Sequence, residues 1–278
     1  DKATIDLSTT NNAFTGALTI TTNDDTDYEA HVTIDGGTTA LIIAASTIDG
    51  DLTLTSGAAA GITDSGTVTL GGNLSATTDA NNGTITLNQL AVTGTIELNT
   101  VVVSNTDEAE AGGGTAITLE DAANNADDFY NSMTVYISSG TGAGQVRTIS
   151  DYVGSTKVAT VAAWTTIPNT TSVYEVRSSF GDATVVNTTS LDFESALVGG
   201  DLVATATNGE ITQDGALNIA GTADFLSSSS GNIILDSAVN DFVGAVRFRG
   251  GAVVIKDVND INFGIGNSTA AGNRLDSS

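Results

Sequence analysis

The chain of 278 residues contains no cysteine, one proline, one histidine and one methionine. Without cysteine it has no disulfide framework, no thiolate zinc site and no cysteine nucleophile. The single histidine, His31, has no second imidazole with which to share a metal, so we interpret it as a satisfied or solvent-facing side chain. Thiol chemistry and cysteine-based metal binding are therefore excluded.

Positive charge is also scarce, since 8 Lys and Arg stand against 33 Asp and Glu, giving a formal net charge of −25. This excess repels nucleic acid and anionic membranes, and we expect neither as a partner. No stretch approaches the roughly 18 to 20 apolar residues of a membrane helix, so we expect no membrane insertion. A cysteine-free acidic chain fits an extracellular location. Because the chain opens on Asp1 without a signal segment, it is either a mature product or a piece of something longer.

The residues that are abundant favour strands and turns. Apolar residues make up 40% of the chain, which is enough for a core. There are 31 glycines, and Thr, Ser, Asn and Asp fill much of the remainder, a mixture typical of short strands and tight turns. The composition predicts an all-β protein.

Internal repeats organise the chain. Residues 5–20 align without a gap on residues 233–248, and a third copy lies at 85–98. A second motif relates residues 41–74 to 191–223 at an offset of 150. The first motif recurs after 78 residues and then after a further 150, so the second interval is 72 residues longer and indicates an insertion of that size.

The insertion is located by its aromatic residues. Six of the 14 aromatics, and the only proline, Pro168, fall between about 107 and 178. We therefore expect three segments: the first part of a repeat domain at 1–106, an inserted small β module at 107–178 and the second part of the repeat domain at 179–278. The module is expected to resemble a small β-barrel or β-sandwich.

The repeats alternate polar and apolar residues with period 2 and are punctuated by Gly, Asn and Asp, a pattern that indicates strands rather than helices. Gly50-Asp51-Leu52 recurs as Gly72-Asn73-Leu74, which gives coils of about 20 residues. Such coils form a parallel β-solenoid, because no coil can bury its apolar face alone. The predicted inward side chains are Ile5, Leu7, Phe14, Leu18, Ile20, Leu52, Leu54, Val68, Leu70, Ile85, Leu87, Ile96, Leu98, Leu202, Leu217, Ile219, Ile233, Leu235, Phe242, Val246 and Phe248.

The repeats resemble a known group of proteins. The stretch GGDLVATATNGEITQDGALNIAGTADF and the one that follows it, GNIILDSAVNDFVGAVRFRGG, look like repeats of filamentous-haemagglutinin-like and autotransporter-like bacterial surface proteins. The resemblance covers residues 1–104 and 180–278. It implies a right-handed parallel β-helix and a role in adhesion, filament formation or surface display, without catalytic residues to transfer.

The insertion resembles a different small β module, one found in phage virion and microbial surface proteins, through its segment DDFYN and the later GTGAGQVRTISDY. The glycine-rich run at 139–144 is predicted to be a hairpin turn, with Trp164 and the tyrosines in the core. Phosphate binding is not predicted for this run, because that fingerprint needs a following helix.

Acidic clusters are the candidate metal ligands. Asp24, Asp25 and Asp27 form one predicted loop, and Asp107 and Glu108 begin another. Calcium takes oxygen ligands from such loops, although neither has the spacing of an EF-hand. Calcium is thus the only cofactor considered, and the alternative is a solvated acidic turn.

An enzyme remains a rival interpretation, because parallel β-helices include polysaccharide-degrading proteins that use carboxylates or arginine. Arg247 and Arg249 alternate on one predicted strand and can bind acidic sugars. The alternative is a surface charge pair beside Asp241 and Asp257. No catalytic residue is assigned, and we expect no enzymatic activity.

The sequence therefore predicts an extracellular structural or adhesive rod at a microbial cell surface, with the inserted module projecting from it. The assembly ends are assigned to Ile5 and Leu7 at one end and to Ile261 and Phe263 at the other. The expected partners are identical subunits stacked head to tail, or further repeats of a longer chain, together with surface glycans. A phage tail or fibre component and a polysaccharide-degrading enzyme remain alternatives.

Overall fold

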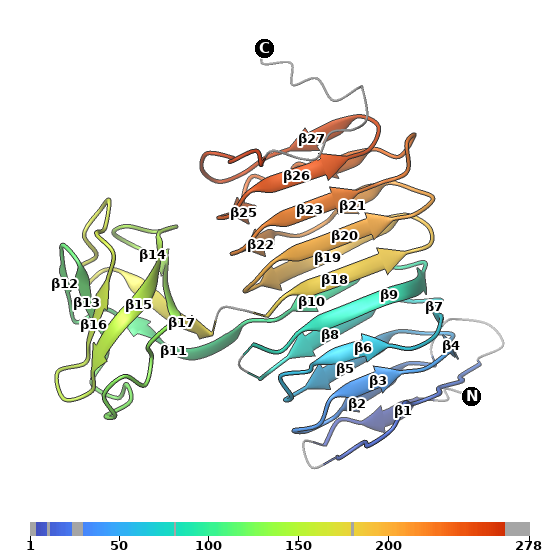
Figure 1. Cartoon of the computed structure of the whole chain (residues 1–278), viewed down its shortest axis with the longest axis horizontal. Helices are drawn as coiled ribbons and strands as arrows, with labels where there is room; N and C mark the ends of the chain where they lie inside the picture. The colour runs from blue at the N-terminus through green and yellow to red at the C-terminus, as the bar shows by residue number, and fades with distance from the viewer. Residues whose placement is uncertain (1–3, 10–11, 24–29, 81, 179–180, 265–278) are drawn as a thin grey trace. The chain divides into compact units, whose positions relative to one another are not determined.

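The computed structural model describes residues 4–9, 12–23, 30–80, 82–178 and 181–264, and all regular elements in these ranges are β-strands (Figure 1). The described residues include no helix that could cross a membrane. The chain divides into two compact units. Asp1–Thr100 and Phe180–Ser278 form the solenoid unit, and Val101–Ser179 form the module, which begins six residues before the predicted position 107.

The solenoid unit consists of two parallel sheets whose strands stack coil upon coil (Figure 1). In spatial order, the eleven-stranded sheet contains β1 (Ile5–Leu7), β2 (Val32–Asp35), β5 (Leu52–Ser56), β8 (Leu74–Thr78), β10 (Ile96–Asn99), β19 (Leu191–Val198), β21 (Ile211–Gln213), β24 (Ile233–Leu235) and β27 (Val253–Ile255), with β22 (Leu217–Ile219) and β25 (Asp241–Phe242) beside this path. The nine-stranded sheet contains β26 (Val246–Arg249), β23 (Ala223–Leu226), β20 (Leu202–Ala206), β18 (Ala183–Asn187), β9 (Ile85–Val92), β6 (Ile62–Asp64) and β3 (Leu41–Ile43), with β4 (Ser46–Ile48) and β7 (Val68–Leu70) beside it. The predicted parallel β-solenoid is confirmed.

Each coil has a short arm in one sheet and a long arm in the other. A short arm is a single strand of three to five residues, such as β5 or β20. A long arm is either one eight-residue strand, as in β9 and β19, or two short strands in succession, as in β6 with β7. The arms therefore give every coil an asymmetric outline.

The two arms exchange sheets halfway along the solenoid. Between residues 32 and 99 the short arms lie in the eleven-stranded sheet, whereas between 183 and 249 they lie in the nine-stranded sheet. Each of these two structural copies has four short arms and three long arms, which makes three and a half coils. A copy thus begins and ends in the same sheet, and the next copy must begin in the other.

The solenoid core is formed by the alternate inward positions of both sheets. Most of the predicted inward side chains are almost fully buried, as with Leu52, Leu54, Phe242 and Val246 at 1–2% exposure. Leu7 is an exception, because its side chain is 39% exposed. The reason is its place in β1, beyond which the described residues supply no further strand. Ile5, Phe14, Leu18 and Phe248 are partly buried against the same core.

Side-chain oxygens at the corners join each coil to the next. Asp51 Oδ1 accepts the Asn73 amide N–H at 2.7 Å, and Asn73 Oδ1 accepts the Thr95 N–H at 2.8 Å. In the second structural copy Asp182 Oδ1 accepts from Asp201, and Asp201 Oδ1 from Thr222. The Gly-Asp/Asn-Leu signal is therefore a ladder of corner hydrogen bonds that satisfies amides not used by the strands.

Glycine precedes these corner residues because the preceding coil occupies the space. A Cβ on Gly72 would lie 2.3 Å from Asp51 Oδ1 and 2.7 Å from the Gly50 carbonyl carbon. A Cβ on Gly94 would lie 2.2 Å from Asn73 Oδ1. The corner glycines therefore permit close stacking.

The module is a seven-stranded antiparallel sheet with the order β11-β17-β14-β15-β16-β13-β12 (Figure 1). Its strands are β11 (Val102–Glu108), β12 (Ala111–Gly113), β13 (Ala116–Thr118), β14 (Thr134–Ser139), β15 (Val146–Val153), β16 (Val158–Val161) and β17 (Val173–Ser178). Side chains from both halves of the sheet share one core that includes Tyr130, Tyr152, Trp164 and Tyr174. The glycine-rich run forms the predicted hairpin turn between β14 and β15, with positive φ at Gly140, Gly142 and Gly144.

Replacement of Gly72 by Ala is expected to destabilise the solenoid by about 1–3 kcal/mol, the usual cost of overpacking, because the new methyl group overlaps Asp51 and the Gly50 backbone. Gly16→Ala is the matched control, since nothing lies within 4 Å of its Cβ position. Urea unfolding followed by circular dichroism measures both. Equal unfolding midpoints for the two variants would show that the corner at position 72 does not require glycine.

Deletion of residues 101–180, with Thr100 joined to Gly181, is expected to leave a folded solenoid. Thr100 Oγ1 already donates to the Gly181 carbonyl at 2.7 Å. The fusion leaves three corner residues between Asn99 and Ala183, the same number as between Arg249 and Val253. The expected result is a soluble variant with a circular dichroism spectrum typical of β-sheet and a cooperative unfolding transition.

The control for this deletion removes residues 100–182 and joins Asn99 directly to Ala183, which leaves no corner between the two strands. We expect this control to aggregate or unfold. If the first variant behaves in the same way, the module is needed for the solenoid to fold.

Candidate functional site

The predicted site residues fall into two regions, the acidic loops and the solenoid ends. Asp24, Asp25 and Asp27 lie outside the described residues. Asp107 and Glu108 form the last two residues of β11 in the module. Only the second acidic loop therefore lies among the described residues.

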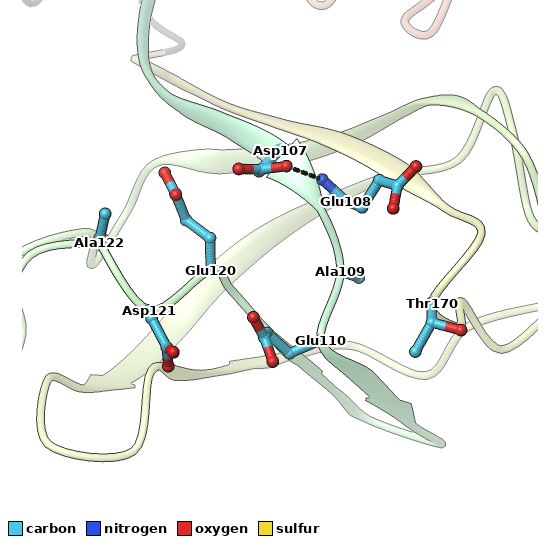
Figure 2. Close-up of a pocket in the computed structure, with 8 residues that line it drawn as sticks. All are labelled: Asp107, Glu108, Ala109, Glu110, Glu120, Asp121, Ala122 and Thr170. Atoms are coloured by element: carbon cyan, nitrogen blue, oxygen red, sulfur yellow. Dashed lines mark hydrogen bonds between the residues drawn. The ribbon is translucent and has the colours of Figure 1, made fainter.

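An acidic hollow of about 440 Å³ opens beside the end of β11 (Figure 2). Two segments line it, one running from the end of β11 toward β12 and one following β13, and Thr170 completes it. Figure 2 labels the lining residues as Asp107, Glu108, Ala109, Glu110, Glu120, Asp121, Ala122 and Thr170. Sequence reasoning identified the first pair of carboxylates but not Glu120 and Asp121, which the sheet brings beside them.

The carboxylates around the hollow have local partners. Asp107 Oδ1 accepts the N–H of Glu108 at 2.7 Å (Figure 2), and Glu120 Oε1 accepts from Asn105 Nδ2 at 2.7 Å. In the described part of the chain, no three acidic or histidine side chains are arranged to hold a metal ion. The hollow concentrates negative charge and offers hydrogen-bond acceptors, and calcium binding stays a prediction.

A closed hydrogen-bond ring includes Glu120, one of the residues that line the hollow. The buried Tyr174 hydroxyl donates to Asn105 Oδ1 at 2.5 Å and accepts the Glu120 N–H at 2.9 Å. Asn105 in turn donates to the Glu120 carboxylate, which closes the ring. Burial raises the pKa of Tyr174, because the phenolate would be desolvated. The ring therefore fixes Glu120 relative to β11 and β17.

A buried lysine organises another loop of the module. Lys157, 9% exposed, donates through Nζ to the Ala123 carbonyl and to Asn125 Oδ1, each at 2.6 Å. Tyr152 donates to the neighbouring Asn124 carbonyl at 2.7 Å. Sequence reasoning missed this cage. The only sequence signal for it was the lysine itself, because lysine and arginine are scarce in this chain and number 8 in total.

The GTGAGQ-x-R segment singled out in the sequence has a structural role. Gln145 Oε1 accepts the N–H groups of Thr165 and Thr166 at 2.8 and 3.1 Å. The Arg147 guanidinium lies 5.3 Å from the Trp164 ring centroid and donates to the Ala163 carbonyl. These contacts join the glycine-rich turn to the segment after β16.

The arginine pair of β26 has a different partner from the expected one. Arg247 makes two charge-assisted hydrogen bonds to Asp224 on the neighbouring strand β23, a residue that the sequence interpretation did not name beside it. The parallel register places these two residues directly opposite. His31 accepts the Asp51 N–H at 3.0 Å through Nδ1, so it belongs to the corner ladder.

The predicted end residues lie at opposite ends of the described solenoid. Ile5 and Leu7 belong to β1, the first strand of the eleven-stranded sheet. Ile261 is partly buried and Phe263 is 43% exposed beside the last strands. Phe263 makes a bridge to Val246 and an edge-to-face contact with Phe248 at 5.8 Å. The described residues thus present half-open apolar surfaces at both ends.

Alkaline pH is expected to unfold the module, because burial, with a smaller contribution from Tyr130, raises the pKa of Tyr152 to about 12. The unfolded tyrosine ionises near pH 10, so this stabilisation is complete below pH 10 and is lost as the pH rises toward 12. Fluorescence of Trp164, the only tryptophan, reports on the module. Tyr152→Phe should flatten the pH dependence, and an unchanged profile would show that other groups cause it.

Comparison with curated proteins found no match, and comparison with solved structures found none. The pattern of a family described as "Repeats of unknown function (DUF5649)" matches residues 29–99 and 181–249. Together these are 140 of 278 residues, just over half of the chain. The two matches end at the last residues of β10 and β26, where the two structural copies end. The chain therefore belongs to the DUF5649 repeat family, and each of the two matches spans one structural copy.

Proposed function

We propose that this protein is an extracellular structural rod at a microbial cell surface, in which the DUF5649 repeats form the shaft and the module is an adhesive element. The observation that carries the proposal is the repeat solenoid itself, with two structural copies stacked on one continuous apolar core. Repeat solenoids grow by addition of coils without a change in the contacts between neighbours. Such an architecture suits a load-bearing shaft.

The chemistry of the surface supports the same role. The outward carboxylates are joined to hydroxyl groups of adjacent coils, as where Ser75 donates to Glu97 at 2.9 Å and Thr212 to Asp192 at 2.7 Å. The large negative charge keeps shafts soluble and apart from one another side to side. Proposed partners are surface glycans for the module and repeat coils for the shaft, and we propose no catalytic activity.

Surface exposure is the first expected result. Antibodies against the purified chain should label intact cells of the organism that encodes it, with no need to permeabilise them. Antibodies against a cytoplasmic protein serve as the control. Labelling of virions, or only of permeabilised cells, would contradict the proposal, and virion labelling would favour a phage fibre.

The absence of catalysis is tested separately. Incubation of the purified chain with acidic polysaccharides should release no unsaturated or reducing ends. A β-helical polysaccharide lyase is the positive control. Release that disappears in Arg249→Ala, while circular dichroism is unchanged, would favour the enzyme interpretation.

A further inference from the structure

The C-terminal face of the solenoid has an apolar surface that is covered at the equivalent position inside the molecule. Val253, Ile255 and Ile261 are only partly buried, and Phe263 is 43% exposed. Seventy residues earlier, the matching side chains of the second structural copy are at 0% exposure: Ala183, Val185, Leu191 and Phe193. There the next coil, with β20 and β21, covers them. A stacked coil is therefore what this surface fits.

The N-terminal face has the same character. Ile5, Phe14 and Leu18 are partly buried, and Leu7 is 39% exposed. Their counterparts 228 residues later are at 0–2% exposure: Ile233, Leu235, Phe242 and Val246. Each face therefore exposes side chains that are buried wherever the repeat continues.

The two faces also match in the order of their arms. At the C-terminal face the eleven-stranded sheet ends in the short arm β27, and the nine-stranded sheet ends in residues 261–263, which correspond to the start of the long arm β19. At the N-terminal face, β1 begins a long arm in the eleven-stranded sheet, and residues 18–21 form a short arm in the other.

The molecule already contains this junction. At the boundary between the two structural copies, the short arm β10 pairs with the long arm β19. In the other sheet the long arm β9 pairs with the short arm β18. When a C-terminal face is placed on an N-terminal face, so that each sheet continues into the same sheet of the next copy, a short arm again meets a long arm in the eleven-stranded sheet. In the nine-stranded sheet a long arm again meets a short arm.

We propose that the C-terminal face, formed by β27 and residues 261–263, binds the N-terminal face, formed by β1 and residues 14–21, of a second copy of this chain. The inference rests on the proposed shaft function and specifies how the shaft lengthens. The contact joins two different surfaces and does not close, so it produces filaments. Net repulsion between copies is screened beyond about 8 Å at physiological salt, which leaves the contact itself effective.

The test uses the full chain with one face blocked at a time. Leu7→Glu blocks the N-terminal face, and Phe263→Glu blocks the C-terminal face. Both positions are already partly exposed, so the solenoid should still fold. Ile42→Glu is the matched control, because Ile42 is 38% exposed and lies on an outward position of β3, between Leu41 and Ile43 at 0%.

Light scattering at 0.15 M salt should show that the mass of the native chain and of the Ile42→Glu control rises with concentration, and electron microscopy should show unbranched filaments. Each blocked variant alone should remain a monomer. An equimolar mixture of the two should give a one-to-one dimer and nothing longer, because one intact face of each kind remains.

A native chain that stays monomeric at high concentration overturns the proposal, as does a mixture that forms no dimer. Filaments from either blocked variant alone would also overturn it, since they would need another surface. These results are independent of cell-surface labelling. A monomer that labels intact cells would leave the proposed surface function standing and refute only the head-to-tail contact.

Discussion

Coil-to-coil pairing of parallel strands is the constraint on which the solenoid depends. A coil has one short arm and one long arm and cannot bury its apolar side chains by itself, so every coil obtains its core from the ones before and after it. The register must be the same at each step, because a shift of one residue would turn the apolar side chains outward. Asp51 and Asn73 maintain that register at the corners, where each accepts an amide from the next coil. The glycines beside them allow the coils to approach closely enough.

The module depends on another kind of organisation. Its sheet is antiparallel, and buried polar groups in it are satisfied by individual side chains rather than by a repeated ladder. Tyr174, Asn105 and Glu120 form one such group, and Lys157 with the carbonyls around it forms another. Buried polar groups are costly unless they are paired, so these contacts specify one arrangement of the loops. The acidic hollow is a product of that arrangement.

Much of the fold could be predicted from the sequence, because the coils of a solenoid repeat the same pattern of residues along the chain. The recurrence of Gly-Asp/Asn-Leu and the alternation of apolar residues gave the parallel coils and most of the core. Leu7 occupies a predicted inward position and is nevertheless 39% exposed, since alternation identifies the inward direction but not whether another coil covers it. The partner of Arg247 was also missed. Asp224 is 23 residues away in sequence and becomes its neighbour only through the register of β23 and β26.

The site was less predictable. Asp107 and Glu108 are adjacent in sequence and were found, whereas Glu120 and Asp121 reach the same hollow through the pairing of an antiparallel sheet. Lys157 carries no motif, and its partners are backbone carbonyls, which every residue possesses. Sequence patterns reveal repeated local contacts, and they do not reveal unique contacts between distant segments.

The half-integral number of coils in each repeat has a geometric consequence for how the family can vary. Because a repeat of three and a half coils ends in the sheet where it began, one boundary turns from the eleven-stranded to the nine-stranded sheet, and the next turns back. The boundary after β10 is crossed by 83 residues, 100–182, whereas the boundary after β26 is crossed by three. The two corners of a coil lie on opposite edges of the solenoid. A series of such repeats therefore offers insertion points in two rows, one along each edge, and consecutive repeats use alternate rows.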